Sequence, residues 1–281
     1  MKNTKGNRAQ PMSATGLPVT NWVHEWRESD KEPNEWAIRT VADTLVADVL
    51  SGRRSDGSGR FRPSMIGNDC GRAQVLSYLG FEQAESKPEW AQMADAGTWL
   101  HYKWQYEGLA AGWLVEPEIQ IDIPEWELRG AVDGLCVDDS IFELKTIGTD
   151  KYMGRKHTLP VSKWETPMRE HIRQVHAYMK ATNTMAASIV YVDRDSNAFR
   201  EFRVHWDPAI FEEMDAFVKS MQSDVRSAVL PPILTGCVQA MKERHNPGAF
   251  DAPVSKTAAG RKFNFCNYRD VCEHAVFPKE A

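Results

Sequence analysis

The segment 128–146 constrains the fold of this chain more than any other part of the sequence. Two apolar runs, 128–137 and 141–146, flank the polar turn 138–140. Runs of this length around a turn of Asp and Ser residues are typical of two antiparallel strands. The sequence therefore predicts a β-hairpin at this position.

The hairpin carries three charged side chains at fixed separations. Asp133 lies on the first strand, and Glu143 and Lys145 follow on the second. Because alternate side chains of a strand share a face, Glu143 and Lys145 should emerge together while Phe142 and Leu144 face the core. Two carboxylates and one ammonium can hold a hard divalent cation and place a water for attack on a phosphodiester. A surface salt bridge is the alternative, because such a trio arises easily by chance.

Two helical segments around the hairpin add further polar residues. Gly97 and His101 precede it with the spacing Gly-x-x-x-His, and Gln174 and Tyr178 follow it on one helix face. Together with the Gly-x-x-Asp that ends at Asp133 and the Glu-x-Lys of the second strand, these motifs resemble the RecB-like branch of the PD-(D/E)XK nuclease superfamily. The resemblance is greatest to the CRISPR-associated and phage RecB-like exonucleases, and it covers about residues 64–275.

The resemblance implies a role for each motif residue. It implies a site for Mg²⁺ or Mn²⁺ whose ligands are three side chains and the main-chain carbonyl of Leu144, the side chains being those of His101, Asp133 and Glu143. Lys145 would orient or deprotonate the attacking water and stabilise charge that develops on the phosphate. Gln174 and Tyr178 would steady the site and contact the DNA backbone. Without the resemblance, packing against aromatic neighbours is the alternative for His101.

The chain is mildly acidic, with 34 Lys and Arg residues against 39 Asp and Glu residues and a net charge of -5. This balance does not suit a protein that coats DNA, but a nuclease needs only a local positive track. One such track leads into the Gln-x-x-x-Tyr helix, and we expect five of its cations to contact DNA: Lys151, Arg155, Lys156, Arg169 and Arg173. Solvated surface charge is the alternative. On the same helix, His171 and His176 are interpreted as helix-surface or phosphate-facing residues and not as ligands.

Cysteine spacing gives a second chemical signal. Three cysteines resemble those that flank the fold in the iron-sulfur nucleases of the AddB and CRISPR-associated type: Cys70, Cys266 and Cys272. That family has one more cysteine where this chain has Phe263, so Cys237 is the candidate fourth ligand of a 4Fe-4S cluster. Buried thiols are the alternative for all four, and Cys136 in the apolar hairpin is interpreted as a buried thiol.

Hydrophobic periodicity predicts an α/β fold. Helices are expected over 36–50, 72–79, 91–108, 169–181 and 208–229, and strands over 113–123, the hairpin, 187–192 and 197–205. This order predicts a restriction-endonuclease-like core, which is a central mixed β-sheet flanked by helices, with an N-terminal helical region and a C-terminal cysteine-bearing segment.

The expected domain organisation is simple. Residues 1–18 are polar and are expected to form a disordered arm, whereas 19–281 should form a single nuclease domain. Its core should span about residues 90–230, and the segment 231–281 should pack back near Cys70.

These inferences predict a metal-dependent DNA exonuclease of phage or bacterial DNA recombination, repair or replication, acting on single-stranded or duplex ends. A structure-specific endonuclease and a DNA-end-binding accessory subunit of a recombination complex are the alternatives. The chain lacks a Gly-x-x-x-x-Gly-Lys-Ser/Thr stretch, so unwinding would need a helicase or recombination partner. Neither a secretory signal nor an apolar run long enough for a membrane is visible, which predicts a cytoplasmic protein with reduced thiols. The oligomeric state is left open.

Overall fold

The computed structural model describes residues 16–30, 32–51, 59–84, 88–154, 159–235, 237–238 and 266–277. A mixed sheet with the strand order β1-β2-β3-β4-β5 lies at its centre. The strands are β1 (Leu114–Ile123), β2 (Leu128–Cys136), β3 (Ile141–Ile147), β4 (Ala186–Asp193) and β5 (Phe199–His205). Neighbouring strands are antiparallel except β3 and β4, which are parallel. The expected central mixed sheet is therefore confirmed.

Helices surround this sheet. In the described part of the chain they are α1 (Pro18–Glu28), α2 (Glu35–Ser51), α3 (Pro63–Ile66), α4 (Gly71–Tyr78), α5 (Pro88–Ala111), α6 (Thr149–Tyr152), α7 (Arg169–Thr182) and α8 (Pro208–Arg226), with the 3-10 turns η1 (Pro124–Trp126) and η2 (Val161–Lys163). Helix α7 makes the crossover that parallel strands such as β3 and β4 require. None of the described helices has the length and apolarity to cross a bilayer.

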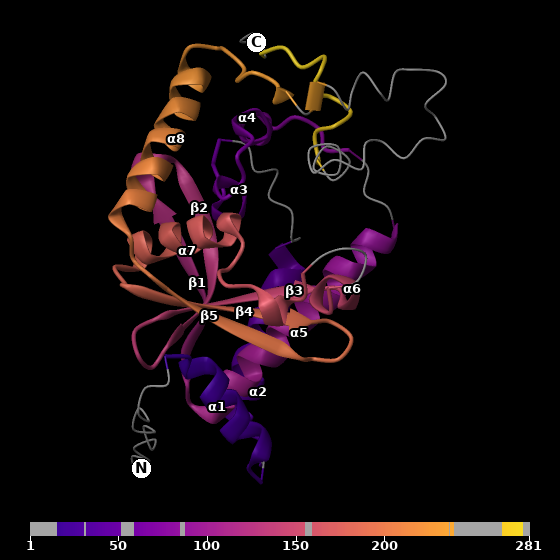
Figure 1. Cartoon of the computed structure of the whole chain (residues 1–281), viewed down its shortest axis with the longest axis vertical. Helices are drawn as coiled ribbons and strands as arrows, with labels where there is room; N and C mark the ends of the chain where they lie inside the picture. The colour runs from indigo at the N-terminus through magenta and orange to yellow at the C-terminus, as the bar shows by residue number, and fades with distance from the viewer. Residues whose placement is uncertain are drawn as a thin grey trace.

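The two faces of the sheet are covered by different helices. Figure 1 shows α7 and α8 on one side of the strands and α1, α2 and α5 on the other. Along β4, Ile189 and Tyr191 enter the core beneath α7 and α8, whereas Val190 and Val192 enter the core beneath α1 and α5. This alternation explains why β4 reads as one continuous apolar run, because a strand buried on both faces has no polar side.

Helix α1 begins at Pro18, the last residue of the expected N-terminal arm. Residues 1–15 lie outside the described residues. The cap of α1 is not local: the carboxylate of Glu201, on β5, accepts the backbone N–H of Thr20 at 2.7 Å. A helix whose capping acid lies on a distant strand carries no capping signal in its own sequence.

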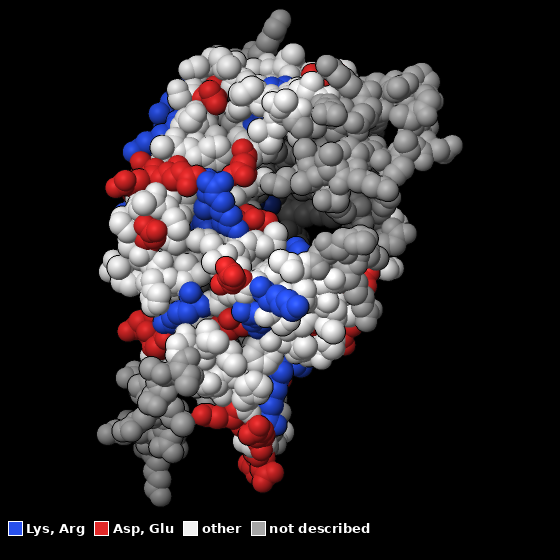
Figure 2. All heavy atoms as spheres, viewed as in Figure 1, with Lys and Arg blue, Asp and Glu red and all other residues white. Residues whose placement is uncertain are grey.

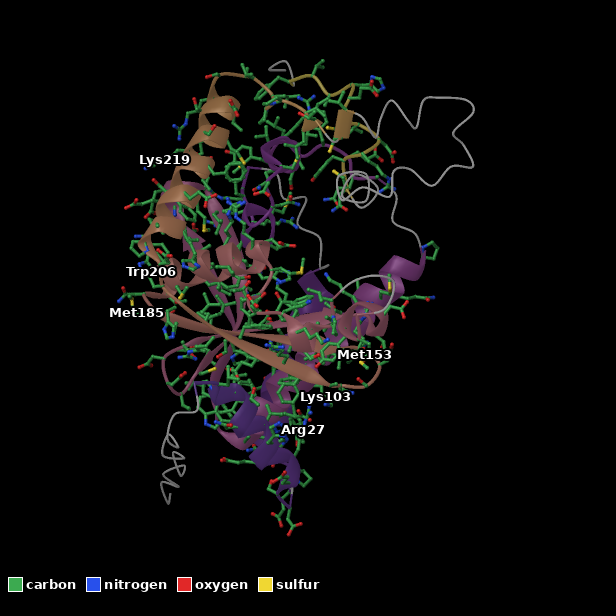
Figure 3. All side chains as sticks on the ribbon, in the orientation of Figure 1. Arg27, Lys103, Met153, Met185, Trp206 and Lys219 are labelled. Carbon is green, nitrogen blue, oxygen red and sulfur yellow. The ribbon has the colours of Figure 1, made fainter. Side chains whose placement is uncertain are left out.

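The far end of α1 is fastened to α5. Arg27 of α1 forms an ion pair with Glu107 of α5 at 3.3 Å, and Lys103 contacts the same carboxylate at 3.1 Å. Figure 3 shows Arg27 and Lys103 together on this part of the molecule. The N-terminal helix is therefore held at both ends, by β5 and by α5.

The described C-terminal residues 266–277 pack against α4. Tyr268 and Cys272 form an apolar cluster with Leu76 of α4. The guanidinium of Arg72 donates to the backbone carbonyl of Cys272 at 2.8 Å and to that of Pro231 at 2.9 Å. One buried arginine thus links α4 to two separate parts of the C-terminal region.

Candidate active site

Asp133 and Glu143 lie where β2 and β3 cease to pair. The ladder between these strands consists of two residue pairs next to the turn. Beyond them, Oδ2 of Asp133 accepts the backbone N–H of Leu144 at 2.7 Å, so a side chain takes the place of a strand partner. The interrupted ladder leaves room between the strands for the two carboxylates.

Lys145 follows on the same face of β3, as the strand alternation predicts. Its Nζ lies 2.5 Å from Oε1 of Glu143 and donates to Oε1 of Gln174 at 2.8 Å. The amide nitrogen of Gln174 donates in turn to the hydroxyl of Tyr178 at 2.6 Å. Gln174 and Tyr178 are 5% and 4% exposed, and the predicted contacts of both with the DNA backbone do not fit this burial. Gln174 therefore fixes the Lys145 ammonium through a hydrogen bond, and Tyr178 fixes Gln174 in turn.

Gly97 explains how the histidine reaches the strands. A Cβ atom at this position would lie 2.8 Å from Oγ1 of Thr146, so glycine allows α5 to cross the end of β3 closely. His101 lies one turn further along α5, with its Nδ1 atom 3.3 Å from Oδ1 of Asp133. The Gly-x-x-x-His spacing therefore reflects a tight contact between helix and strand that places the histidine at the carboxylates.

The two carboxylates differ in their electrostatic setting. Burial raises the pKa of Glu143 to about 7, Asp133 adds to the rise, and Lys145 opposes it. Burial also acts to raise the pKa of Asp133, but His101 and Lys145 together with a backbone N–H hold that pKa below its ordinary value. For His101 burial acts to lower the pKa, but the carboxylates of Asp133, Glu143 and Glu118 together raise it above its ordinary value. Two acids so close together favour a bound cation, because they repel each other when both are ionised.

The donor chemistry of this group suits a hard divalent cation. Oε2 of Glu143 is buried and has no hydrogen-bond partner among the described residues, although buried carboxylate oxygens in proteins are as a rule paired. Asp133 contacts His101 and accepts the backbone N–H of Leu144, the residue that follows Glu143 on β3. Within the described ranges, no three His, Cys, Asp or Glu side chains already converge as a metal site. Instead, Asp133 contacts His101, and Glu143 contacts Lys145.

A cavity of about 240 Å³ opens beside His101. Its lining residues are Ala94, Gly97, Thr98, His101, Tyr102, Glu118 and Thr146. Glu118, on β1, is a site residue that our sequence analysis missed. Its Oε1 atom accepts the side-chain amide of Gln105 at 2.6 Å. The only signal for it in the sequence was its position on an expected strand next to the hairpin.

The two arginines of the predicted DNA-binding track are engaged within the protein. Arg173 is 5% exposed, and its guanidinium contacts Asp69 at 2.9 Å and also Glu213. Arg169 contacts the same two acids. These ion pairs join α7 to α8 and to the loop before α4, so a structural role accounts for Arg173 in place of the predicted phosphate contact.

Of the three remaining cations of the track, the structure describes Lys151. Lys151 is exposed on α6, with its ammonium 5.9 Å from the ring centroid of Trp164. Arg155 and Lys156 lie outside the described residues. On the face drawn in Figure 2, Lys and Arg side chains are interspersed with Asp and Glu side chains. Among the described cations of the track, Lys151 and Arg169 are thus exposed, and Arg169 is held in ion pairs.

The histidines of α7 are internal. His176 is fully buried, with Nδ1 2.8 Å from the carbonyl of Ile172 and Nε2 accepting the backbone N–H of Asp207, so the expectation of a surface position was wrong. His171 is partly buried against Tyr191, with 2.7 Å between Nδ1 and the tyrosine hydroxyl. Burial lowers the pKa of His171 to about 3, and neighbouring lysines contribute. Neither histidine is placed among the candidate ligands.

The cysteines gather near the C-terminal segment. Three of the four predicted iron-sulfur cysteines belong to the apolar cluster on α4: Cys237, Cys266 and Cys272. Burial raises the pKa of Cys266, and Cys70 and Cys272 add to the rise. In the parts of the chain that the structure describes, no three of these thiols are grouped so that they could hold a metal ion. Cys136 is 1% exposed on β2, as expected for a buried thiol.

No protein-family model and no curated protein matches the chain. Among solved structures, it is similar to the alkaline exonuclease LHK-Exo from Laribacter hongkongensis, at 16% identity over 61% of this chain and 90% of that chain, with a TM-score of 0.46. LHK-Exo in complex with dAMP matches at 19% identity over 60% and 89% of the two chains, with a TM-score of 0.48. SSO0001 matches at 13% identity over 85% and 96%, with a TM-score of 0.36. At these identities and TM-scores, functional assignment rests on the site itself.

Proposed function

We propose that this protein is a divalent-metal-dependent deoxyribonuclease that hydrolyses phosphodiester bonds. One observation carries the proposal: Asp133 and Glu143 meet at the parting of two strands, with His101 on one side and Lys145 on the other. A structural salt bridge explains the pairing of Lys145 with Glu143, but it does not explain a buried carboxylate oxygen without a partner.

The ligands would be the side chains of His101, Asp133 and Glu143 and the carbonyl of Leu144. Mg²⁺ or Mn²⁺, when bound there, would polarise the phosphate and acidify the attacking water. Lys145 supports the reaction from the neighbouring position on β3. Its ammonium has three N–H groups, of which Glu143 and Gln174 accept two among the described residues, so the third would orient the water or meet charge developing on the phosphate.

The mode of action that we propose is exonucleolytic, on single-stranded or duplex DNA ends. This follows the motif resemblance, in which Gly-x-x-x-His and Gln-x-x-x-Tyr accompany the acidic hairpin. A recombination or repair setting with a helicase or recombination partner belongs to the same proposal. A reducing, cytoplasmic setting is part of the same proposal.

End-labelled linear DNA and circular DNA, each incubated with Mn²⁺ and purified protein, test this proposal. We expect loss of label from linear DNA, survival of circular DNA, and no digestion by the Asp133→Asn variant. Asp122→Asn is the matched control, because Asp122, on β1, forms a surface ion pair with Arg129 of β2. Cutting of circular DNA would make the protein an endonuclease, and binding of ends without cutting would make it an accessory subunit.

We also propose that Cys70, Cys237, Cys266 and Cys272 hold iron, as a 4Fe-4S cluster, in the protein as produced in cells. Supporting this are the shared position of Cys237, Cys266 and Cys272 against α4 and the electrostatic effect of Cys70 on Cys266. Anaerobically purified protein should then be brown and contain thiolate-bound iron, and Cys266→Ala should bleach it. Colourless wild-type protein without iron or zinc would return these residues to the role of buried thiols.

A further inference from the structure

Gln105 links three elements at the level of Asp133. It lies on α5 one turn beyond His101, and its side chain is fully buried. Its Nε2 atom donates to Oε1 of Glu118 at 2.6 Å and to the backbone carbonyl of Asp133 at 3.1 Å. Both partners are acceptors, so they fix the orientation of the amide, and each of its two N–H bonds meets one of them. One side chain thereby joins α5 to β1 and β2.

Glu118 adopts an unusual backbone conformation to make this contact. Its φ of 50° lies in the left-handed region, within β1 and between two regular strand pairs, Pro117 with Gly134 and Ile119 with Val132. The position between those pairs is the one opposite Asp133. Left-handed residues other than glycine, asparagine and aspartate are uncommon, and within a strand such a conformation persists only when its surroundings fix it. Here the strain turns the Glu118 carboxylate toward Gln105 and the cavity beside His101.

The arrangement does not look like ordinary core packing. Oε1 of Gln105 is buried without a partner among the described residues, so the amide serves its two acceptors while its own acceptor stays unsatisfied. An apolar residue would fill the same space without that cost. What the glutamine adds is a fixed distance between the turn of α5 that carries His101 and the backbone of Asp133.

We infer that Gln105 and Glu118 are positioning residues that hold Asp133 and His101 in register and so set the affinity of the site for its divalent cation. The inference rests on the proposed function, because it takes Asp133 and His101 to be ligands. Hydrogen-bonding partners behind metal ligands orient them, and losing one typically weakens metal binding by about tenfold or more. Glu118 acts here as the acceptor that orients Gln105, through a hydrogen bond and not as a ligand.

Binding of Mn²⁺ to the DNA-free protein, followed by the electron paramagnetic resonance signal of free Mn²⁺, tests this role without any cleavage assay. Glu118→Ala removes the acceptor, and we expect it to weaken Mn²⁺ binding about tenfold or more. Glu118→Gln keeps an acceptor oxygen and removes the charge, and we expect Mn²⁺ affinity close to that of the wild type. Glu116→Ala, on the same strand but exposed, is the control and should bind as the wild type does.

Thermal unfolding of the metal-free variants separates positioning from folding. Glu118→Ala leaves one buried N–H of Gln105 without its acceptor, so it should unfold at a somewhat lower temperature than the wild type while remaining fully folded at the temperature of the Mn²⁺ measurement. Wild-type Mn²⁺ affinity in Glu118→Ala, an equal loss in Glu118→Gln, or a metal-free protein that is already unfolded would each overturn the inference. Failure of the proposed function looks different, because then the wild type itself would bind no Mn²⁺, or Asp133→Asn would bind it unchanged.

Discussion

At the scale of single residues, variants of His101 and Lys145 distinguish a role in metal binding from a role in the chemical step. His101 contacts Asp133 and should act through metal affinity, so His101→Ala should recover much of its cleavage rate when Mn²⁺ is raised. Lys145 contacts Glu143 and Gln174, and Lys145→Ala should lower kcat by about a hundredfold or more at any Mn²⁺ concentration. Cleavage rates across a Mn²⁺ titration measure both. Full recovery of Lys145→Ala in excess Mn²⁺ would show that the lysine has no chemical role.

His171 predicts how stability depends on pH. The hydroxyl of Tyr191 accepts the backbone N–H of Met168 and can donate to Nδ1 of His171, which suits a neutral imidazole. The pKa of His171 is lowered to about 3 by burial and nearby lysines, whereas an unfolded histidine takes up its proton near 6.5. Between these values the unfolded state binds more protons, so stability is retained above about pH 6.5 and falls as the pH drops toward about 3.

Urea midpoints near neutral pH and at about pH 4.5 measure this dependence. His171→Gln should lose less stability than the wild type on this shift, because it removes a group that protonates only on unfolding. His205, which is exposed on β5, supplies the matched variant His205→Gln, and that protein should follow the wild type. An acid response of His171→Gln as steep as that of the wild type would contradict the assignment.

At the scale of elements, the contact between α5 and β3 should set the geometry of the site. Gly97→Ala places a Cβ atom 2.8 Å from Oγ1 of Thr146 and should push α5 outward, which weakens Mn²⁺ binding and cleavage together. Adding Thr146→Ala removes the clashing oxygen and should restore both. Mn²⁺ affinity of the single and double variants measures the effect, and a single variant with wild-type affinity would show that the close approach is unimportant for the histidine.

The anchoring of α1 gives a second prediction at this scale. Glu201 is 3% exposed and accepts hydrogen bonds from the first turn of α1 and from the hydroxyl of Ser188 at 2.6 Å. Glu201→Ala leaves these donors buried and unpaired, which should cost about 1–3 kcal/mol in the free energy of unfolding. Urea unfolding measures the loss. Glu212→Ala, on α8, is a control that should change stability little.

Sequence patterns predicted some elements and site residues of this fold and missed others. Periodicity located β4, β5, α5 and α7 to within a few residues, because burial on these elements is regular. It missed α1, whose cap comes from Glu201 on the last strand. The acidic hairpin was identified because strand alternation and a short turn are local. Glu118 was not, because a left-handed residue within a strand has no side-chain signature, and Arg173 was misjudged because a charge does not reveal its partners in the fold.

At the scale of the whole molecule, Arg72 joins the chain end to the body of the protein. It is 8% exposed, and its guanidinium reaches the carbonyls of Pro231, Cys272 and Ala275. Arg72→Ala should speed hydrogen exchange and proteolysis in the segment 266–277 while the exchange of β2 and β3 stays slow. Arg226→Ala, at the exposed end of α8, is the control. Uniform protection of 266–277 in both variants would show that the apolar cluster alone holds this segment.

The ion pairs of the two acids within the candidate site have a consequence for how the molecule folds. His101 beside Asp133 and Lys145 beside Glu143 act as internal counterions, so two acids can be buried before any dication arrives. Under the proposed function, metal binding would then exchange one set of positive charges for another, because the two carboxylates are already neutralised in the metal-free protein. Under the proposed function, the chain would therefore fold before it meets the ion, and loading with metal would be a separate, later event.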